Sequence, residues 1–139
     1  MTIATFNGDV SPQEAWQSLA ERPAAILVDV RTSAEWAFVG GPDLSSLEKA
    51  VFKIDWQRFP EMARNESFVE EVCAAGITKD HSIYLICRSG VRSRAAAIEL
   101  AERGYSTYNV ADGFEGQLAA NGHRGLGGWR ADSLPWKQT

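Results

Sequence analysis

One short segment of this 139-residue sequence brings together residue types that could do chemistry. Residues 87–94 read CRSGVRSR, so that three arginines accompany the thiol of Cys87 and no acidic residue interrupts them. Positive charge beside a cysteine favours the thiolate, which is the reactive nucleophile. Gly90 permits a tight loop whose backbone N–H groups point inward, where they can bind an anion. The segment therefore predicts a sulfur nucleophile that attacks an anionic substrate.

Two regular elements must position this loop. Residues 82–86, SIYLI, form a continuous apolar run that is typical of a buried strand. Residues 93–103 are rich in Ala, Leu and Glu and are followed by Gly104, which is typical of a helix and its C-terminal stop. We therefore expect Cys87 at the carboxyl end of a strand, beside the positive N-terminus of a helix that begins at about Ser93.

Strands and helices alternate along the rest of the chain. Apolar runs predict further strands at residues 24–30, 50–54 and 107–110. Helices are expected after Ser11, after Ser33 up to residue 38, over residues 65–75, and near residues 114–120. This alternation is typical of βαβ units, in which helices cover both faces of a parallel sheet. The sequence predicts an α/β fold with a central, mostly parallel sheet of about five strands, and ligands bind at the carboxyl ends of such strands.

Charge and composition exclude several classes of protein. Fourteen Lys and Arg against eighteen Asp and Glu give a net charge of −4, so a nucleic-acid partner is not expected. No apolar stretch approaches the roughly 20 residues that cross a membrane, and no secretory signal is visible, so we expect a cytoplasmic protein with no membrane partner. Cys73 and Cys87 are too few for a disulfide framework. Together with His81 and His123 they lack metal-site spacing, so no metal site is expected.

The segment CRSGVRS resembles the active-site loop of single-domain rhodanese-like proteins. The preceding SIYLI and the following RAAAIELAERGYSTYNVADGF are similar to the strand and helix that flank that loop, and LVDVRTSAEW at residues 27–36 is similar to the other signature of the family. The resemblance implies one rhodanese-like domain over residues 1–139, folded as a three-layer sandwich. Its signature region would cover about residues 24–120, with a C-terminal coil at 121–139 packed on it.

The resemblance also implies sulfur transfer, with no cofactor. The nucleophile Cys87 would take the outer sulfur from thiosulfate or a similar small anionic donor, hold it as a persulfide, and pass it to cyanide or a thiol, a protein thiol being among the acceptors. Arg92 would contact the donor, while Asp29 and Arg31 would be a supporting pair with a structural role. The substrate-binding residues implied in this way are Arg88, Ser89, Gly90, Val91, Arg92 and Ser93.

Two departures from the family and two rival classes bear on this interpretation. The family usually has Gly-His-Ile-Pro-Gly-Ala where this sequence has VGGPDLSSL, without histidine, and the apolar Val91 leaves the donor open. Cysteine phosphatases and arsenate reductases place five residues between cysteine and arginine, whereas four separate Cys87 from Arg92, and Ile86 stands where tyrosine phosphatases have histidine. A non-catalytic rhodanese-like module that docks a partner or binds an anion is the main alternative, although degenerate modules usually lose the cysteine.

The remaining distinctive residues have simpler interpretations. Cys73 lies on the apolar face of the expected helix 65–75 and is predicted to be a buried structural thiol. Trp129 and Trp136, in the glycine-rich tail, are expected to cover apolar surface, and an aromatic docking patch is the alternative. The sequence does not place Arg124 and Arg130 relative to the Cys87 loop.

Overall fold

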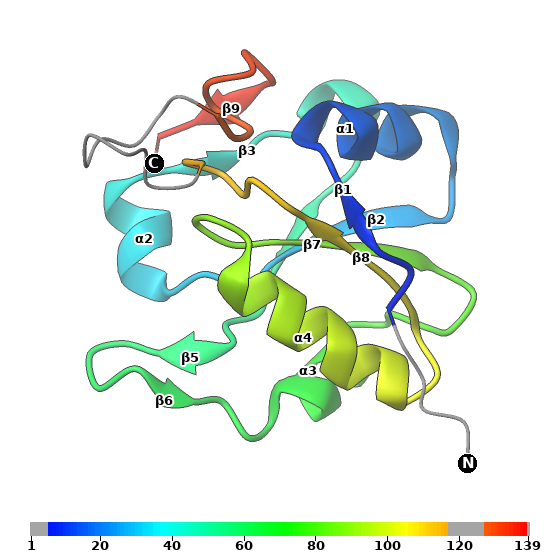
Figure 1. Ribbon diagram of the computed structural model, residues 1–139, viewed down its shortest axis with the longest axis vertical. Coiled ribbons are helices and arrows are strands. Elements are labelled where there is room, and N and C mark those ends of the chain that lie inside the picture. Colours follow the sequence, from blue (N-terminus) through cyan, green and yellow to red (C-terminus); the bar gives the residue numbers. More distant parts are fainter. Residues whose placement is uncertain (1–5, 117–126, 139) are drawn as a thin grey trace.

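The computed structural model describes residues 6–116 and 127–138. Within these residues, five strands form a central sheet in which every neighbouring pair is parallel (Figure 1). The order across the sheet is β1 (Asp9–Val10), β8 (Ser106–Val110), β7 (Ser82–Ile86), β2 (Ala25–Asp29) and β4 (Val51–Lys53). The predicted parallel α/β sheet is therefore confirmed, and the short edge strand β1 is an element that the sequence pattern does not indicate.

Helices cover both faces of this sheet, which gives the three layers seen in Figure 1. The helices are α1 (Pro12–Glu21), α2 (Ser33–Phe38), α3 (Phe68–Ala74) and α4 (Val91–Glu102). Helix α1 packs on one face in a cluster with Leu27, Tyr84 and Ile86, whereas α3 and α4 pack on the other face in a cluster with Val28 and Leu85. Because successive strand residues point to opposite faces, β2 and β7 supply apolar side chains to both clusters and read as continuous apolar runs.

The helix starts explain which element boundaries follow from the sequence and which do not. Ser11 caps α1 through a reciprocal capping box with Glu14, as its spacing predicts. Helix α2 is capped by Thr32 rather than by Ser33, because a second capping box joins Thr32 to Glu35. Helix α4 begins at Val91 instead of Ser93, since Gly90 takes the N-cap position with φ 104°.

Two further expectations are corrected by the structure. Residues 114 and 115 lie in a turn and residue 116 has no regular structure, instead of starting a helix, and the rest of the expected helix at 114–120 lies outside the described residues, as does Arg124. Cys73 is exposed rather than buried, because α3 turns its Val72 and Phe68 toward the core. Two small antiparallel pairs join β3 (Gly41–Pro42) to β9 (Trp136–Lys137), and β5 (Gln57–Arg58) to β6 (Ala63–Arg64).

Among the described residues of the glycine-rich tail, Trp129 belongs to the core. Trp129 is fully buried in the cluster on the α1 side, with its ring at 5.9 Å from that of Trp16, as expected for a tryptophan that covers apolar surface. Trp136 on β9 packs edge-on against Phe114 and stays exposed on its other side. No helix of the described residues is long and apolar enough to cross a membrane.

Lys49 closes the end of α1. Its ammonium group donates hydrogen bonds to the carbonyl oxygens of Leu19, Arg22 and Ala25 at 2.8, 2.7 and 2.6 Å. Burial lowers the pKa of Lys49. These carbonyls lie at the helix C-terminus and beyond it, where the helix itself supplies no donor.

We expect Lys49→Met to reduce the free energy of unfolding by about 1–3 kcal/mol, since it keeps the aliphatic stem and removes the donor for partly buried carbonyls. Urea denaturation measures this loss. The matched control is Lys79→Met at an exposed turn lysine, which should unfold within about 0.5 kcal/mol of the parent protein. An equal loss in both variants would contradict the capping role of Lys49.

Candidate active site

Cys87 lies where β7 ends, at the carboxyl edge of the sheet, and the chain turns at once into α4 (Figure 1). We call residues 87–93 the Cys87 loop. The carbonyl oxygens of Cys87 and Arg88 accept hydrogen bonds from the N–H groups of Phe114 and Glu115, at 2.8 and 2.9 Å. These bonds fix the loop against the turn that follows β8. The strand-to-helix position predicted for the cysteine is confirmed.

The sulfur atom of Cys87 is enclosed by its own loop. The residue is 1% exposed, and its Sγ accepts a hydrogen bond from the N–H of Gly90 at 3.1 Å. The hydroxyl of Ser93 lies 3.2 Å from the same sulfur. Both donors come from the start of α4, whose N-terminus carries a partial positive charge. The arrangement stabilises negative charge on sulfur.

Gly90 is required by the shape of the loop. Its φ of 104° lies in the left-handed region that other residues rarely adopt, and a Cβ at this position would overlap the backbone carbonyl of Ala111. In this conformation the backbone of Gly90 packs closely on Ala111 and its N–H points at the sulfur.

A buried hydrogen-bonded chain continues behind the sulfur. The hydroxyl of Ser93 lies 2.5 Å from Oδ1 of Asn109, and the amide of Asn109 donates to Oδ1 of Asp9 at 2.9 Å and to the carbonyl of Gly90 at 3.2 Å. Because a hydroxyl has a single proton, Ser93 donates to either Cys87 or Asn109 at one time. The chain links β1 and β8 to the floor of the Cys87 loop.

Arg92 forms a bidentate ion pair with Glu35 of α2. Its Nη1 and Nη2 donate to the two carboxylate oxygens at 2.7 and 3.0 Å. Burial raises the pKa of Glu35, but the hydrogen bonds and charge of Arg92, together with the charge of Arg31, outweigh burial and hold that pKa below its ordinary value. Burial lowers the pKa of Arg92, but Glu35 and the nearby Cys87 raise it by more. Both partners are therefore charged at neutral pH.

Arg88 pairs with a different acidic residue, Glu115. Its Nε lies 3.2 Å from a carboxylate oxygen of Glu115, and Arg130 of the C-terminal segment lies 3.8 Å from the other oxygen. Arg130 thus reaches the turn beside the Cys87 loop through a shared glutamate. Arg88 is half exposed, so this pair is weaker than the pair of Arg92 and Glu35.

Asp29 and Arg31 form a fully buried ion pair at the end of β2. The guanidinium of Arg31 donates to both carboxylate oxygens, at 2.7 to 3.1 Å, and its Nη2 also donates to the carbonyl of Gly40 at 2.6 Å. Its Nη1 has no hydrogen-bond acceptor among the described residues, and the guanidinium carbon lies 4.6 Å from the centre of the Phe114 ring. The pair joins β2 to the segment before β3 and to the turn that holds the Cys87 loop.

A cavity of about 390 Å³ opens in front of the Cys87 loop, and we call it the front cavity. Its charged lining is formed by two ion pairs, Arg92 with Glu35 and Arg88 with Glu115. The rest of the lining consists of Thr32, Ala34, Val39, Phe59 and Met62. The cavity is thus a place where a small molecule would meet both charged and apolar groups.

The other loop residues face elsewhere. Ser89, Gly90 and Val91 line a separate cavity of about 250 Å³ together with Asp9 and Asn109. Val91 is 76% exposed and does not line the front cavity. Of the loop residues expected to bind substrate, Arg88 and Arg92 therefore line the front cavity and Ser89, Gly90 and Val91 line the second one. Ser93 is fully buried beneath the sulfur and lines neither.

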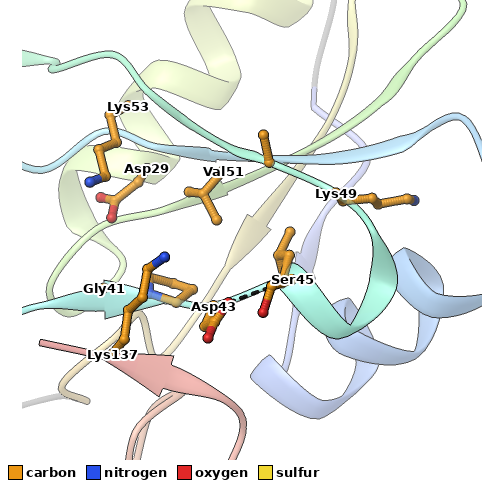
Figure 2. Close-up of a pocket in the computed structure, with 11 residues that line it drawn as sticks. Asp29, Gly41, Asp43, Ser45, Lys49, Val51, Lys53 and Lys137 are labelled. Carbon is orange, nitrogen blue, oxygen red and sulfur yellow. Dashed lines mark hydrogen bonds between the residues drawn. The ribbon is translucent and has the colours of Figure 1, made fainter.

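A third cavity, of about 250 Å³, lies between β4, β3 and the segment that links them (Figure 2). Figure 2 shows Lys53 pointing toward the carboxylate of Asp29. Lys137 on β9 also lines the cavity. Among the described residues that line this cavity, none belongs to the Cys87 loop. It is a site distinct from the front cavity.

Several residues around the Cys87 loop and the front cavity carry no sequence signal of their role. Glu35 belongs to a signature segment, but its pairing with Arg92 spans 57 positions. Asn109 sits in a strand with no local sign of what it binds. Phe59 and Met62 come from the β5–β6 hairpin, whose sequence has no recognisable strand pattern. Only the three-dimensional fold brings these groups together.

Comparison with known proteins identifies a family profile and solved structures that this chain resembles. The rhodanese-like domain profile matches residues 11–120. The crystal structure of Rv0390 from M. tuberculosis is 45% identical, with a TM-score of 0.87, and the match covers 97% of this chain and 100% of that one. The solution structure of a polysulfide-sulfur transferase homodimer from Wolinella succinogenes shares the fold at 20% identity, with a TM-score of 0.62 over 94% of this chain and 78% of that one.

Sequence relatives are similar over most of their length. Uncharacterized protein RC0915 of Rickettsia conorii is 36% identical over 131 residues, which are 93% of this chain and 96% of that protein. Thiosulfate sulfurtransferase GlpE of Haemophilus influenzae is 29% identical over 113 residues, which are 81% of this chain and 89% of that protein. With the profile match over residues 11–120, these likenesses show that the chain belongs to the rhodanese-like domain family.

Proposed function

We propose that this protein is a sulfurtransferase that carries sulfane sulfur as a persulfide on Cys87. One observation supports the proposal above all others: the sulfur of Cys87 is held at a helix N-terminus with the Gly90 N–H at 3.1 Å and the Ser93 hydroxyl at 3.2 Å. These groups favour an anionic sulfur, which is the form that attacks a sulfur donor. The likeness to thiosulfate sulfurtransferases supports the same chemistry.

In the first half of the reaction, the Cys87 thiolate attacks the outer sulfur of the donor. A bond forms between the two sulfur atoms while the bond from the outer sulfur to the rest of the donor breaks. With thiosulfate, the products are the Cys87 persulfide anion and sulfite, which leaves with the electron pair of the broken bond. In the second half, cyanide or a thiolate attacks the outer sulfur of the persulfide, and the Cys87 thiolate is released.

The loop residues would serve this cycle in different ways. The backbone N–H groups of residues 88–93 would hold the negative charge of the persulfide, because they lie at the N-terminus of α4. Ser93 would turn its proton toward the sulfur when the sulfur is anionic and toward Asn109 when it is not. Arg92 would contact the donor from its place beside Glu35. Asp29 and Arg31 would act as structural supports, since they are fully buried.

The test mixes the purified protein with thiosulfate and follows two readouts, thiocyanate production on addition of cyanide and the intact mass before that addition. We expect turnover, and a gain in mass of one sulfur atom that cyanide removes. Hydrolysis of an aryl phosphate in a parallel sample would instead favour the phosphatase class. If thiosulfate and organic thiosulfonate donors all leave the mass unchanged, the protein is not a persulfide-forming enzyme and the non-catalytic module is the better interpretation.

A further inference from the structure

The front cavity exposes two large apolar side chains beside two arginines that flank the candidate nucleophile in the sequence. Phe59 is 56% exposed and Met62 is 38% exposed, and both line the cavity together with the arginines of the Cys87 loop. Val39 and Ala34 add apolar surface from α2 and its end. Apolar surface that faces water in a cavity binds an apolar group of a ligand, because water is released from both. An inorganic anion offers no such group.

The hairpin that carries these side chains is held in one position. The N–H of Met62 donates to the carbonyl of Arg58 at 2.7 Å, and Arg58 is paired with Glu71 of α3 at 3.0 Å. Asn65, just after β6, donates to the carbonyl of Asp55 at 2.9 Å. Phe59 and Met62 are therefore presented to the cavity by an anchored loop.

The backbone at Met62 gives a second reason to connect the hairpin with a ligand. Its φ of 58° lies in the left-handed region, which a long side chain rarely adopts. Such conformations persist where the surroundings determine them, and they cluster at sites that contact ligands.

The charges in the front cavity cancel. Glu35 pairs with Arg92 and Glu115 pairs with Arg88, so that each arginine that lines the cavity meets a carboxylate that lines it too. A donor with two negative charges would be repelled by both glutamates and would compete with Glu35 for Arg92. A donor with one negative charge meets less of this repulsion.

We infer that the preferred sulfur donor is an organic one, which carries an apolar group against Phe59 and Met62 and a single negative charge on its sulfur-bearing end. This inference rests on the proposed function and names its class of substrate. Organic thiosulfonates and organic persulfides share this chemistry. With a thiosulfonate, the Cys87 thiolate takes the outer sulfur, the bond between that sulfur and the sulfonyl sulfur breaks, and an organic sulfinate leaves with the electron pair. With a persulfide, a thiolate leaves in the same way.

The experiment compares benzenethiosulfonate with thiosulfate. The rate constant for loading of Cys87 is measured for each donor by rapid quenching and intact mass, in the parent protein and in Phe59→Ala and Met62→Ala. The quantity of interest is the rate constant with benzenethiosulfonate divided by that with thiosulfate, since the difference in intrinsic reactivity between the donors is the same in every variant. We expect each substitution to lower this ratio about tenfold, as the loss of a partly buried aromatic or thioether contact would. A benzyl persulfide tested in the same way separates the two donor chemistries.

Two further variants sharpen the result. Phe38→Ala is the matched control, because Phe38 is 78% exposed on α2 and does not line the front cavity, and it should leave the ratio unchanged. Glu35→Gln removes the competing carboxylate while keeping a side chain that can cap α2, and it should lower the ratio by speeding the reaction with thiosulfate.

The outcomes separate this inference from the proposed function. If thiosulfate loads Cys87 but Phe59→Ala and Met62→Ala leave the ratio within twofold of the parent value, the inference is wrong and the sulfurtransferase proposal stands. If none of the donors loads Cys87, both are wrong. Circular dichroism of each variant verifies that the hairpin substitutions, which are at exposed side chains, leave the fold intact.

Discussion

Cys87→Ser should abolish sulfur transfer, with a loss of more than about 10⁴-fold in turnover, because the variant has no atom that can form a persulfide. The loss should be purely chemical. A serine hydroxyl can accept the hydrogen bond that the Gly90 N–H now gives to sulfur, and it is smaller than the thiol it replaces. We therefore expect the mass gain of one sulfur atom to disappear while the melting temperature changes little.

Cys73→Ser is the matched control for this variant. Cys73 is the other cysteine of the sequence, and it is exposed on α3, away from the Cys87 loop. This variant should load sulfur and turn over as the parent protein does. If Cys87→Ser still gains one sulfur atom and Cys73→Ser does not, the sulfur is carried on the other cysteine and the proposed mechanism is excluded.

Removing one partner of the Asp29–Arg31 pair should strongly destabilise the protein. Arg31→Leu leaves the carboxylate of Asp29 fully buried, and among the described residues the hydrogen bond that remains to it is the one from the N–H of residue 31 at 3.1 Å. An uncompensated buried charge of this kind costs about 3–5 kcal/mol in the free energy of unfolding. The same substitution removes the bond to the carbonyl of Gly40, which adds to the loss.

The double variant Asp29→Leu with Arg31→Leu tests the cause of that loss. It contains no buried charge at this site, so it should be more stable than Arg31→Leu alone, as replacement of buried ion pairs by apolar residues often is. Urea denaturation at neutral pH gives the free energies of unfolding of the parent and the two variants. If the double variant is instead less stable than Arg31→Leu by about 2 kcal/mol, packing and not charge dominates the stability at this position.

The parts of the structure that can be predicted are those written in short stretches of sequence. β7 and α4 flank Cys87 in a pattern of apolar runs and helix formers, and the capping box at Ser11 depends on residues three positions apart. The prediction of a buried Cys73 is wrong because a helical face of mixed character does not reveal its angle to the sheet. The predicted start of α4 is two residues late because the left-handed backbone of Gly90 depends on its contact with Ala111, in a distant part of the chain.

The candidate site shows the same division. A loop of inward-pointing N–H groups at a helix start is indicated by the spacing of CRSGVRS, and the Gly90 N–H does bind the sulfur, but the contact of the Ser93 hydroxyl with the sulfur is seen only in the fold. The ion pairs of the arginines, by contrast, depend on residues that are distant in the sequence. From the sequence alone, Arg92 is expected to be an unpaired charge that can bind a donor anion. In the fold, its guanidinium group already forms a bidentate ion pair with Glu35. Pairings over such distances require the sheet and its helices to be in place, which single-sequence patterns do not specify.

The backbone bonds around Phe114 tie the Cys87 loop to the C-terminal segment. Phe114 donates its N–H to the carbonyl of Cys87 and its own carbonyl accepts from Arg130, while Trp129 donates to Gly113. These bonds form one ladder of three chain segments, and opening it anywhere along its length would loosen the loop as well. We therefore expect the amide hydrogens at residues 114, 115, 129 and 130 to exchange with solvent as one cooperative unit, and a break in the C-terminal segment to loosen the sulfur site.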